Sequence, residues 1–168
     1  MFILLMADFT ELDAVDRRIL DLLQADGRKP QAEIAAAVGV AASTVHERIR
    51  RLERAGVMRP SALVDADAVG LPMLAFTLVA VTDAAAERDL LRRVKLSPQI
   101  LECHHITGEW NYLLKIRAGG SRDLERLLSD EIKAHPGVSR TLTMIALSSA
   151  KETPVLPTQT IGGPVVRP

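Results

Sequence analysis

The segment from Gln31 to Met58 constrains the fold most, because it has the pattern of two short helices joined by a tight turn. Gly39 lies between them and can leave a helix at positive φ at little cost. The residues before it form one apolar stripe at helical spacing: Ile34, Ala35 and Val38. The segment therefore predicts a helix-turn-helix, the motif whose second helix enters the major groove of DNA.

The second helix is predicted from Val45, Ile49 and Leu52, which recur at i, i+4 and i+7, and it ends before Gly56. At about 100° per residue these apolar side chains share one face and leave the other to solvent or a partner. The guanidinium, hydroxyl and imidazole groups there are of the kind that bond to phosphates and base edges. The candidate DNA-binding residues are Ser43, Thr44, His46, Glu47, Arg50, Arg51 and Arg54.

Arg48 lies only about 60° from Val45 around this helix, at the edge of the buried stripe. We expect it to serve the fold by pairing with a carboxylate, Asp13 or Asp16. The chain has 21 basic and 21 acidic residues, yet five arginines and two glutamates lie from residue 47 to 59, a local charge of +3. This modest charge predicts few phosphate contacts per subunit, so two subunits would act together. The alternative is a merely solvated charged face.

Length and composition bound the remaining possibilities. At 168 residues and 48% hydrophobic content, the chain predicts two small soluble domains, each marginal alone, and therefore at least a dimer. The single cysteine, Cys103, cannot form an internal disulfide and suits a reducing cytoplasm. The opening MFILLM is too short to span a membrane and lacks a basic leader, so neither a membrane span nor a signal peptide is predicted. Translation from Met6 is an alternative that would remove residues 1–5.

The pattern before and after the two-helix segment completes the domain organisation. An amphipathic helix from Leu12 to Leu23, capped by Asp13 or Thr10, adds a third helix to the first core. Residues 57–64 form a minimal wing or a linker. We expect a helix-turn-helix domain over residues 8–64, a linker over 65–70, a second domain over 71–152 and an irregular, proline-containing tail over 153–168.

The second domain opens on a continuous apolar run, LPMLAFTLVAV at 71–81, which predicts a buried strand. A helix at 84–96, strands at 100–107 and 112–118 around a turn at 108–111, a helix at 121–135 and a strand at 138–147 follow. The order βαββαβ predicts a four-stranded antiparallel sheet with both helices on one face. Because the first strand is apolar on both sides, we expect a second subunit to cover the other face.

The combination resembles the Lrp/AsnC family, the leucine-responsive or feast/famine transcription regulators. The resemblance is carried by the Val69-Gly70 boundary and by LDAVDRRILDLLQADGR at 12–28, EIAAAVGV and STVHERIRRLERAGVM within 33–58, ITGEWNYLLKI at 106–116 and HPGVSRTLTMIAL at 135–147. It implies an α+β fold: a three-helix, winged helix-turn-helix domain followed by a ferredoxin-like βαββαβ sandwich that binds effectors and forms oligomers. It also implies a homodimer that assembles further into octamers, binds double-stranded operator DNA and responds to a small effector, often an amino acid. No cofactor is expected.

The resemblance places the effector between subunits, near the hairpin turn and the last strand. Hydroxyl, amide and backbone N–H groups there can satisfy an α-carboxylate and an α-ammonium group. The plainer alternative is that the glycine only makes the turn and the threonines only favour strand. The candidate effector-binding residues are Thr107, Gly108, Glu109, Trp110, Asn111, Thr141 and Thr143.

Two positions depart from the family pattern. Ala41 stands where the family usually has a serine that caps the recognition helix, so the cap would come from Ser43 or water. Asn111 stands where the hairpin turn often ends in aspartate, so amino-acid binding would be altered in selectivity or lost.

Three other functions compete with this interpretation. Cys103, His104 and His105 are metal-ligand types, but alternation along a strand puts His104 on the opposite face from the other two, so no metal is expected. The two-domain layout also resembles tetrapyrrole decarboxylases, yet 3% aromatic content and the lack of a catalytic constellation argue against an enzyme. A third possibility, a DNA-compacting protein without an effector, stays open.

Overall fold

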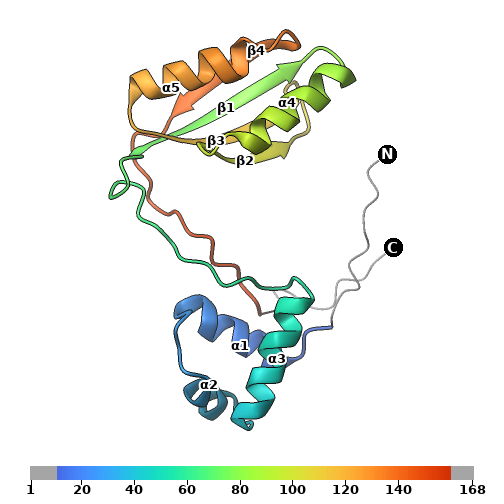
Figure 1. Ribbon diagram of the computed structural model, residues 1–168, viewed down its shortest axis with the longest axis vertical. Helices are drawn as coiled ribbons and strands as arrows, with labels where there is room; N and C mark the ends of the chain where they lie inside the picture. The colour runs from blue at the N-terminus through green and yellow to red at the C-terminus, as the bar shows by residue number, and fades with distance from the viewer. Residues whose placement is uncertain (1–10, 160–168) are drawn as a thin grey trace. The chain divides into compact units, whose positions relative to one another are not determined.

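The computed structural model describes residues 11–159 (Figure 1). Two compact units are present: the described residues up to Ala62 together with those from Thr153 onward, and Leu63–Glu152. Residues 1–10 and 160–168 lie outside the described part, and with them the alternative start at Met6, the alternative cap Thr10 and the end of the expected irregular tail. None of the described helices is long and apolar enough to cross a membrane.

The first unit is built on three helices: α1 (Ala14–Ala25), α2 (Gln31–Val38) and α3 (Ala42–Arg54). Ile19, Ile34 and Val45, one from each helix, are fully buried and form its core. Asp13 is the N-cap of α1, because its carboxylate accepts a hydrogen bond from the Asp16 N–H at 2.7 Å in a capping box. The three-helix prediction is therefore confirmed.

The turn between α2 and α3 follows the sequence prediction at its start and departs from it at its end. Gly39 ends α2 at φ 73°, as expected for a glycine that leaves a helix. Ala41 is the N-cap of α3 and no side chain caps this helix, so Ser43 does not replace the missing family serine. Residues 57–64 contain no strand, so the wing alternative is wrong.

The second unit contains a four-stranded antiparallel sheet in the order β2-β3-β1-β4. This is the topology of the predicted ferredoxin-like unit. One local difference is that the second helix changes to π-helical geometry in its latter half. The elements are β1 (Met73–Val81), α4 (Ala84–Leu96), β2 (Ile100–His105), β3 (Tyr112–Ala118), α5 (Ser121–Leu127), the π-helix η1 (Leu128–Lys133) and β4 (Val138–Ile145).

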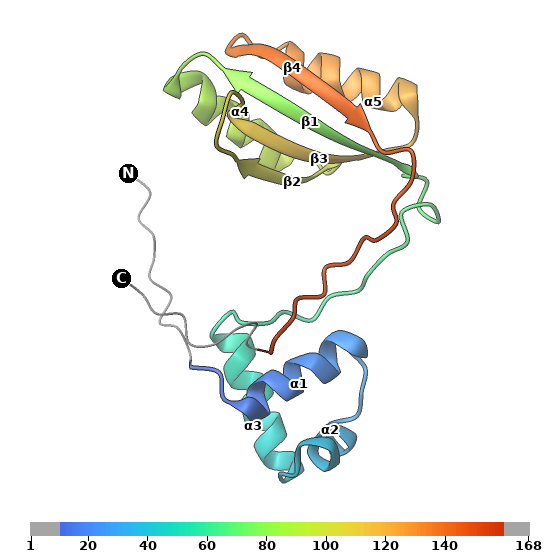
Figure 2. The same cartoon turned by 180° about the vertical axis from the view of Figure 1, so that it is seen from behind.

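Both faces of this sheet carry apolar side chains, but helices cover only one face (Figure 1). Ala75, Val79, Leu114 and Ile116 point to the helix side and are fully buried. Seen from behind, none of the helices of this unit covers the other face (Figure 2). That bare face carries Phe76, Leu78, Leu113, Leu142 and Met144, and the last two are 47% exposed each.

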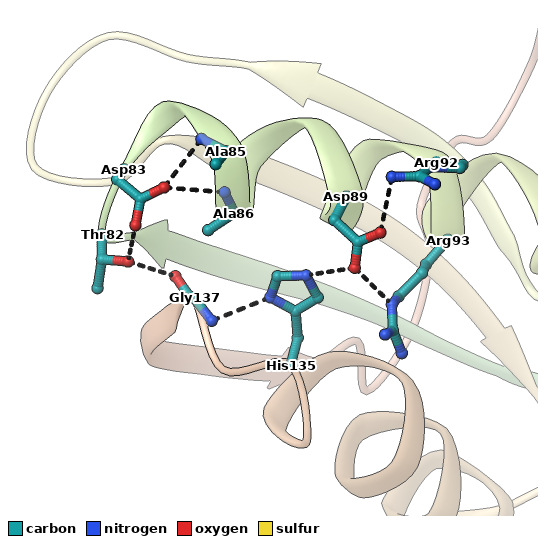
Figure 3. A network of polar contacts seen from close by, with 9 residues as sticks. All are labelled: Thr82, Asp83, Ala85, Ala86, Asp89, Arg92, Arg93, His135 and Gly137. Carbon is teal, nitrogen blue, oxygen red and sulfur yellow. Dashed lines mark hydrogen bonds and ion pairs between the residues drawn. The ribbon is translucent and has the colours of Figure 1, made fainter.

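A polar network joins α4 to the turn before β4 (Figure 3). The buried His135 ring accepts a hydrogen bond from the Gly137 N–H through Nδ1 at 3.1 Å, so Nε2 carries the proton that is donated to Asp89 at 2.9 Å. Hydrogen bonds from Arg93 and then His135 hold the pKa of Asp89 below its ordinary value. Gly137 leaves no room for a side chain, because a Cβ there would lie 1.9 Å from the Ala86 Cβ.

Candidate DNA-binding surface and effector region

The outer face of α3 presents the side chains that the sequence singled out. Because α3 buries Val45 and Leu52 and packs Val45 and Ile49 in the first core, the residues on the other side of the helix face away from that core. All seven candidates are exposed, and together they offer both donors and acceptors. They are Ser43, Thr44, His46, Glu47, Arg50, Arg51 and Arg54.

Arg48 serves the fold, as its position at the edge of the buried stripe predicted. Its Nη1 donates to Asp13 at 2.6 Å and to the fully buried Asp16 at 2.9 Å, which joins α3 to α1. The two carboxylates raise the pKa of Arg48, and the Asp16 N–H and Arg48 lower the pKa of Asp13. Arg51, a DNA-binding candidate, also binds Asp16, with Nη2 at 2.5 Å from the carboxylate. Asp16 therefore holds two arginines of α3 on the α1 side.

The remaining polar groups of α3 differ in how far they are already paired. Arg54 donates to the Glu47 carboxylate at 2.9 Å, and both side chains are 70% exposed. His46 Nδ1 lies 3.3 Å from the Gln31 amide oxygen at the start of α2. Within the described part of the chain, the Arg50 guanidinium has no carboxylate partner. Arg50 is therefore the arginine of α3 with its full donor set available to a ligand.

The hairpin turn between β2 and β3 is held against β4 by Arg140. The Arg140 guanidinium lies 4.3 Å from the centre of the Trp110 ring and donates to the Glu109 carbonyl at 3.1 Å. It is also 3.7 Å from the exposed Glu109 carboxylate. Gly108, at φ 107°, makes the turn. Sequence reasoning missed Arg140, because an arginine inside a strand gives no sign of what it reaches across the sheet.

Asn111 has a structural role in this turn. Its side-chain oxygen accepts a hydrogen bond from the Val81 N–H at 2.9 Å, and its own N–H donates to the Val79 carbonyl at 3.0 Å. The residue thus continues the pairing of β1 with β3 past the end of the strand. An aspartate oxygen could accept the same hydrogen bond. The asparagine at position 111 therefore removes the negative charge of the family's aspartate and keeps this acceptor.

The two threonines of β4 lie on the helix side of the sheet. Thr143 is paired with Thr77, and their hydroxyl oxygens are 3.0 Å apart. Thr143 also lines an open groove between β4 and α5. Thr141 shares this face, since it lies two residues away on the same strand. Arg140, which holds the turn, points to the other side, so one chain does not gather all seven effector candidates at one place.

The cysteine and the two histidines of β2 are divided as strand alternation predicts. Cys103 pairs with Leu114 on the helix side, where burial raises the pKa of its thiol. His105 stacks on the Tyr112 ring at 5.1 Å between centroids. His104 points to the other face and lies 3.1 Å from Glu102. Among residues 11–159, no three His, Cys, Asp or Glu side chains are arranged to hold a metal ion.

The first unit packs three helices around a core and exposes the donor-rich outer face of α3. A ferredoxin-like domain with a bare sheet face follows it. Together these features define a two-domain DNA-binding regulator. Comparison with known proteins agrees: residues 12–53 match the AsnC-type helix-turn-helix domain, and residues 74–156 match the Lrp/AsnC ligand binding domain. The chain belongs to the Lrp/AsnC family of transcriptional regulators, and it is not an enzyme.

Individual relatives share both domains. The chain is 42% identical over 147 residues to the HTH-type transcriptional regulator FL11 of Pyrococcus horikoshii, covering 87% of this chain and 96% of that protein. It is 32% identical over 145 residues to the leucine-responsive regulatory protein of Salmonella typhimurium, covering 84% and 88%. Among solved structures, a Neisseria meningitidis transcriptional regulator in complex with L-methionine is 31% identical with a TM-score of 0.83, covering 88% and 97%.

Proposed function

We propose that this regulator binds operator DNA as a dimer through the outer face of α3, as a cytoplasmic protein. The paired recognition helices enter successive major grooves, about one helical turn apart. The proposal rests on the different pairing of the arginines of α3. Arg48 and Arg51 are bound to Asp16, whereas Arg50 is exposed without a carboxylate partner in residues 11–159.

The other proposed DNA contacts follow from position on α3. Ser43, Thr44 and His46 lie in the first half of the helix, the part of a recognition helix that contacts base edges. Arg54 and Glu47 already pair, so DNA contact by Arg54 would exchange Glu47 for a phosphate. Arg51 would reach DNA only by sharing its guanidinium with Asp16.

The test is selection of a preferred site from a pool of random duplexes, followed by titration of Arg50→Ala on that site. Loss of a bidentate base contact should weaken binding by about 1–3 kcal/mol and relax the preference at one position per half-site. Arg122→Ala, an exposed arginine on α5, is the matched control and should bind as the unchanged protein does. Equal affinities for Arg50→Ala and the unchanged protein would remove Arg50 from the interface.

The dimer is proposed to form through the bare face of the sheet, and dimers to assemble further into an octamer. Leu142 and Met144 leave nearly half of each side chain in water, next to Phe76 and Leu78 on β1. Burial of such a contiguous apolar surface favours association. A charged rim borders it, where Lys115 donates to Glu102 at 3.2 Å.

The effector is proposed to be an amino acid that binds at a subunit interface beside the hairpin turn. The exposed Glu109 carboxylate could receive an α-ammonium group, and Thr107 and the Gly108 backbone could bind the carboxylate. The complex of the Neisseria relative with L-methionine supports this class of ligand. Thr141 and Thr143 would contribute only if a second subunit brought them to the turn.

A thermal-shift screen over the amino acids, run beside gel filtration, tests the effector proposal. A ligand at 100 times its Kd should stabilise by about 2.7 kcal/mol. Glu109→Gln should reduce that shift without changing affinity for the selected operator. If no amino acid shifts the unfolding temperature or the elution volume, the protein acts on DNA without this class of effector.

A further inference from the structure

The chain returns to the first unit after the sheet domain. Residues 153–159 contain no helix or strand, yet they belong to the unit that α1, α2 and α3 form. Leu156 bonds to α1 through its backbone: its N–H donates to Gln24 Oε1 at 2.8 Å and its carbonyl accepts from Gln24 Nε2 at 2.9 Å. One glutamine therefore satisfies both backbone groups of one residue.

The next residues of this segment continue along α1. The Thr158 carbonyl accepts from Arg17 Nη1 at 2.7 Å, and its hydroxyl contacts the Arg17 carbonyl and the Asp21 carboxylate. Gln159 Nε2 donates to the other Asp21 oxygen at 2.7 Å. These donors, the Thr158 hydroxyl first, lower the pKa of Asp21.

The α1 residues that make these contacts form one stripe. Arg17, Asp21 and Gln24 stand at i, i+4 and i+7, so they lie within about 60° of one another around the helix. Ile19, which enters the three-helix core, lies outside this stripe. The stripe is thus free of core packing and presents a donor, an acid and an amide in a row.

We propose that this stripe of α1 is a docking surface for the chain's own C-terminal segment, Val155–Gln159, which straps the end of the sheet domain to the DNA-binding domain. Pro157 favours this arrangement, because the residue before a proline avoids helical geometry and keeps its backbone groups free. Recognition is of the backbone at Leu156 and of side chains at Thr158 and Gln159.

The strap makes a second connection between the two domains. The first is the linker that follows α3. In the second, Glu152 is bonded to Lys115 at 2.9 Å and to Arg117 in the sheet domain, and only residues 153–155 separate it from Leu156. A displacement at the end of the sheet domain would therefore reach α1 through a short tether rather than through a free tail.

Cross-linking of mixed subunits tests the proposal. Gln24→Cys and Leu156→Cys are combined in a Cys103→Ala background, and a parallel preparation keeps Cys103 in case that change impairs folding. Unlabelled and ¹⁵N-labelled chains are mixed, refolded together and treated with a short bismaleimide. Mass spectrometry of the linked peptides then reports whether both ends came from the same copy. Arg18→Cys with Leu156→Cys is the control, because Arg18 is exposed and lies outside the stripe.

The expected result is a cross-link between the thiols introduced by Gln24→Cys and Leu156→Cys, in peptides of uniform label, with at least severalfold lower yield for the Arg18 pair. Asp21→Lys should reduce the yield severalfold, whereas Glu53→Lys, the same charge reversal on exposed α3, should not. Equal yields for the two cysteine pairs would mean that the segment is not docked. Peptides of mixed label would assign the docked segment to another copy, and either result overturns the proposal.

Discussion

The Arg48 guanidinium lies 2.9 Å from the fully buried carboxylate of Asp16, and this ion pair joins the recognition helix to α1. Arg51 binds the other oxygen of the same carboxylate. The orientation of α3 therefore depends on an acid that belongs to a different helix and lies 32 residues away in the chain.

Removal of that acid should destabilise the DNA-binding domain. Asp16→Ala takes away a partner of two arginines and one half of the capping box of α1. Because both guanidinium groups retain access to water, we expect a loss of about 2–3 kcal/mol, below the largest values for broken buried pairs. Urea unfolding followed by circular dichroism measures it. Glu53→Ala, on the exposed side of α3, should change stability by less than about 0.5 kcal/mol.

The free energy of unfolding should decrease in acid because the Asp83 carboxylate caps the N-terminus of α4. The Ala86 N–H, the Thr82 hydroxyl and the Ala85 N–H hold the pKa of Asp83 below its ordinary value of 3.8. The unfolded chain therefore binds the proton first, so this contribution is complete above that value and is lost as pH falls through the folded pKa. Urea midpoints measured from about pH 6 down to 2 should fall accordingly. Asp83→Asn keeps a capping side chain and should flatten the dependence; an unchanged slope would exclude this cap as its source.

Gly137 should not tolerate a side chain, although its backbone conformation is ordinary. A Cβ there would overlap the Ala86 Cβ at 1.9 Å and approach the Ala86 Cα at 3.1 Å. Gly137→Ala should therefore cost more than about 2 kcal/mol, and Ala86→Gly in the same chain should restore part of it. Gly120→Ala is the control, since it has extended backbone and open space around it, and it should unfold like the unchanged protein.

A charge on the bare sheet face should prevent association. Leu142→Lys combined with Met144→Lys places two ammonium groups in the proposed interface, where they would be desolvated without partners. Sedimentation should then show a smaller species at micromolar concentration. Leu96→Lys, at an 80% exposed leucine that ends α4, provides the control. If the double variant keeps the unchanged protein's mass, the subunits associate through another surface.

The local elements were predictable because each repeats a short-range pattern. The helix at 84–96 and the strand at 112–118 have the bounds that the sequence indicated, and Gly39 ends α2 at positive φ. The wing was wrong because residues 57–64 have no strand partner, and pairing is not a local property. The π-helix within 121–135 was missed, since its hydrogen-bond shift leaves the apolar spacing nearly unchanged.

The candidate site was predictable as a surface and not as a set of contacts. The helical spacing separated Arg48 from the outer face of α3 correctly, but it could not show that Arg51 also binds Asp16. Nor could it show that Arg140 holds Trp110, since these residues lie on separate parts of the chain.

The sequence by itself determined the helix-turn-helix, the βαββαβ order and the family, because hydrophobic period and turn residues act over a few neighbours. Only the tertiary structure decided which arginines serve the fold, that Asn111 extends a strand ladder, and that Thr158 returns to α1. Each of these depends on a partner that folding brings close from far along the chain. The sequence determines the charge and length of a side chain, but the packing of the folded chain determines its partner.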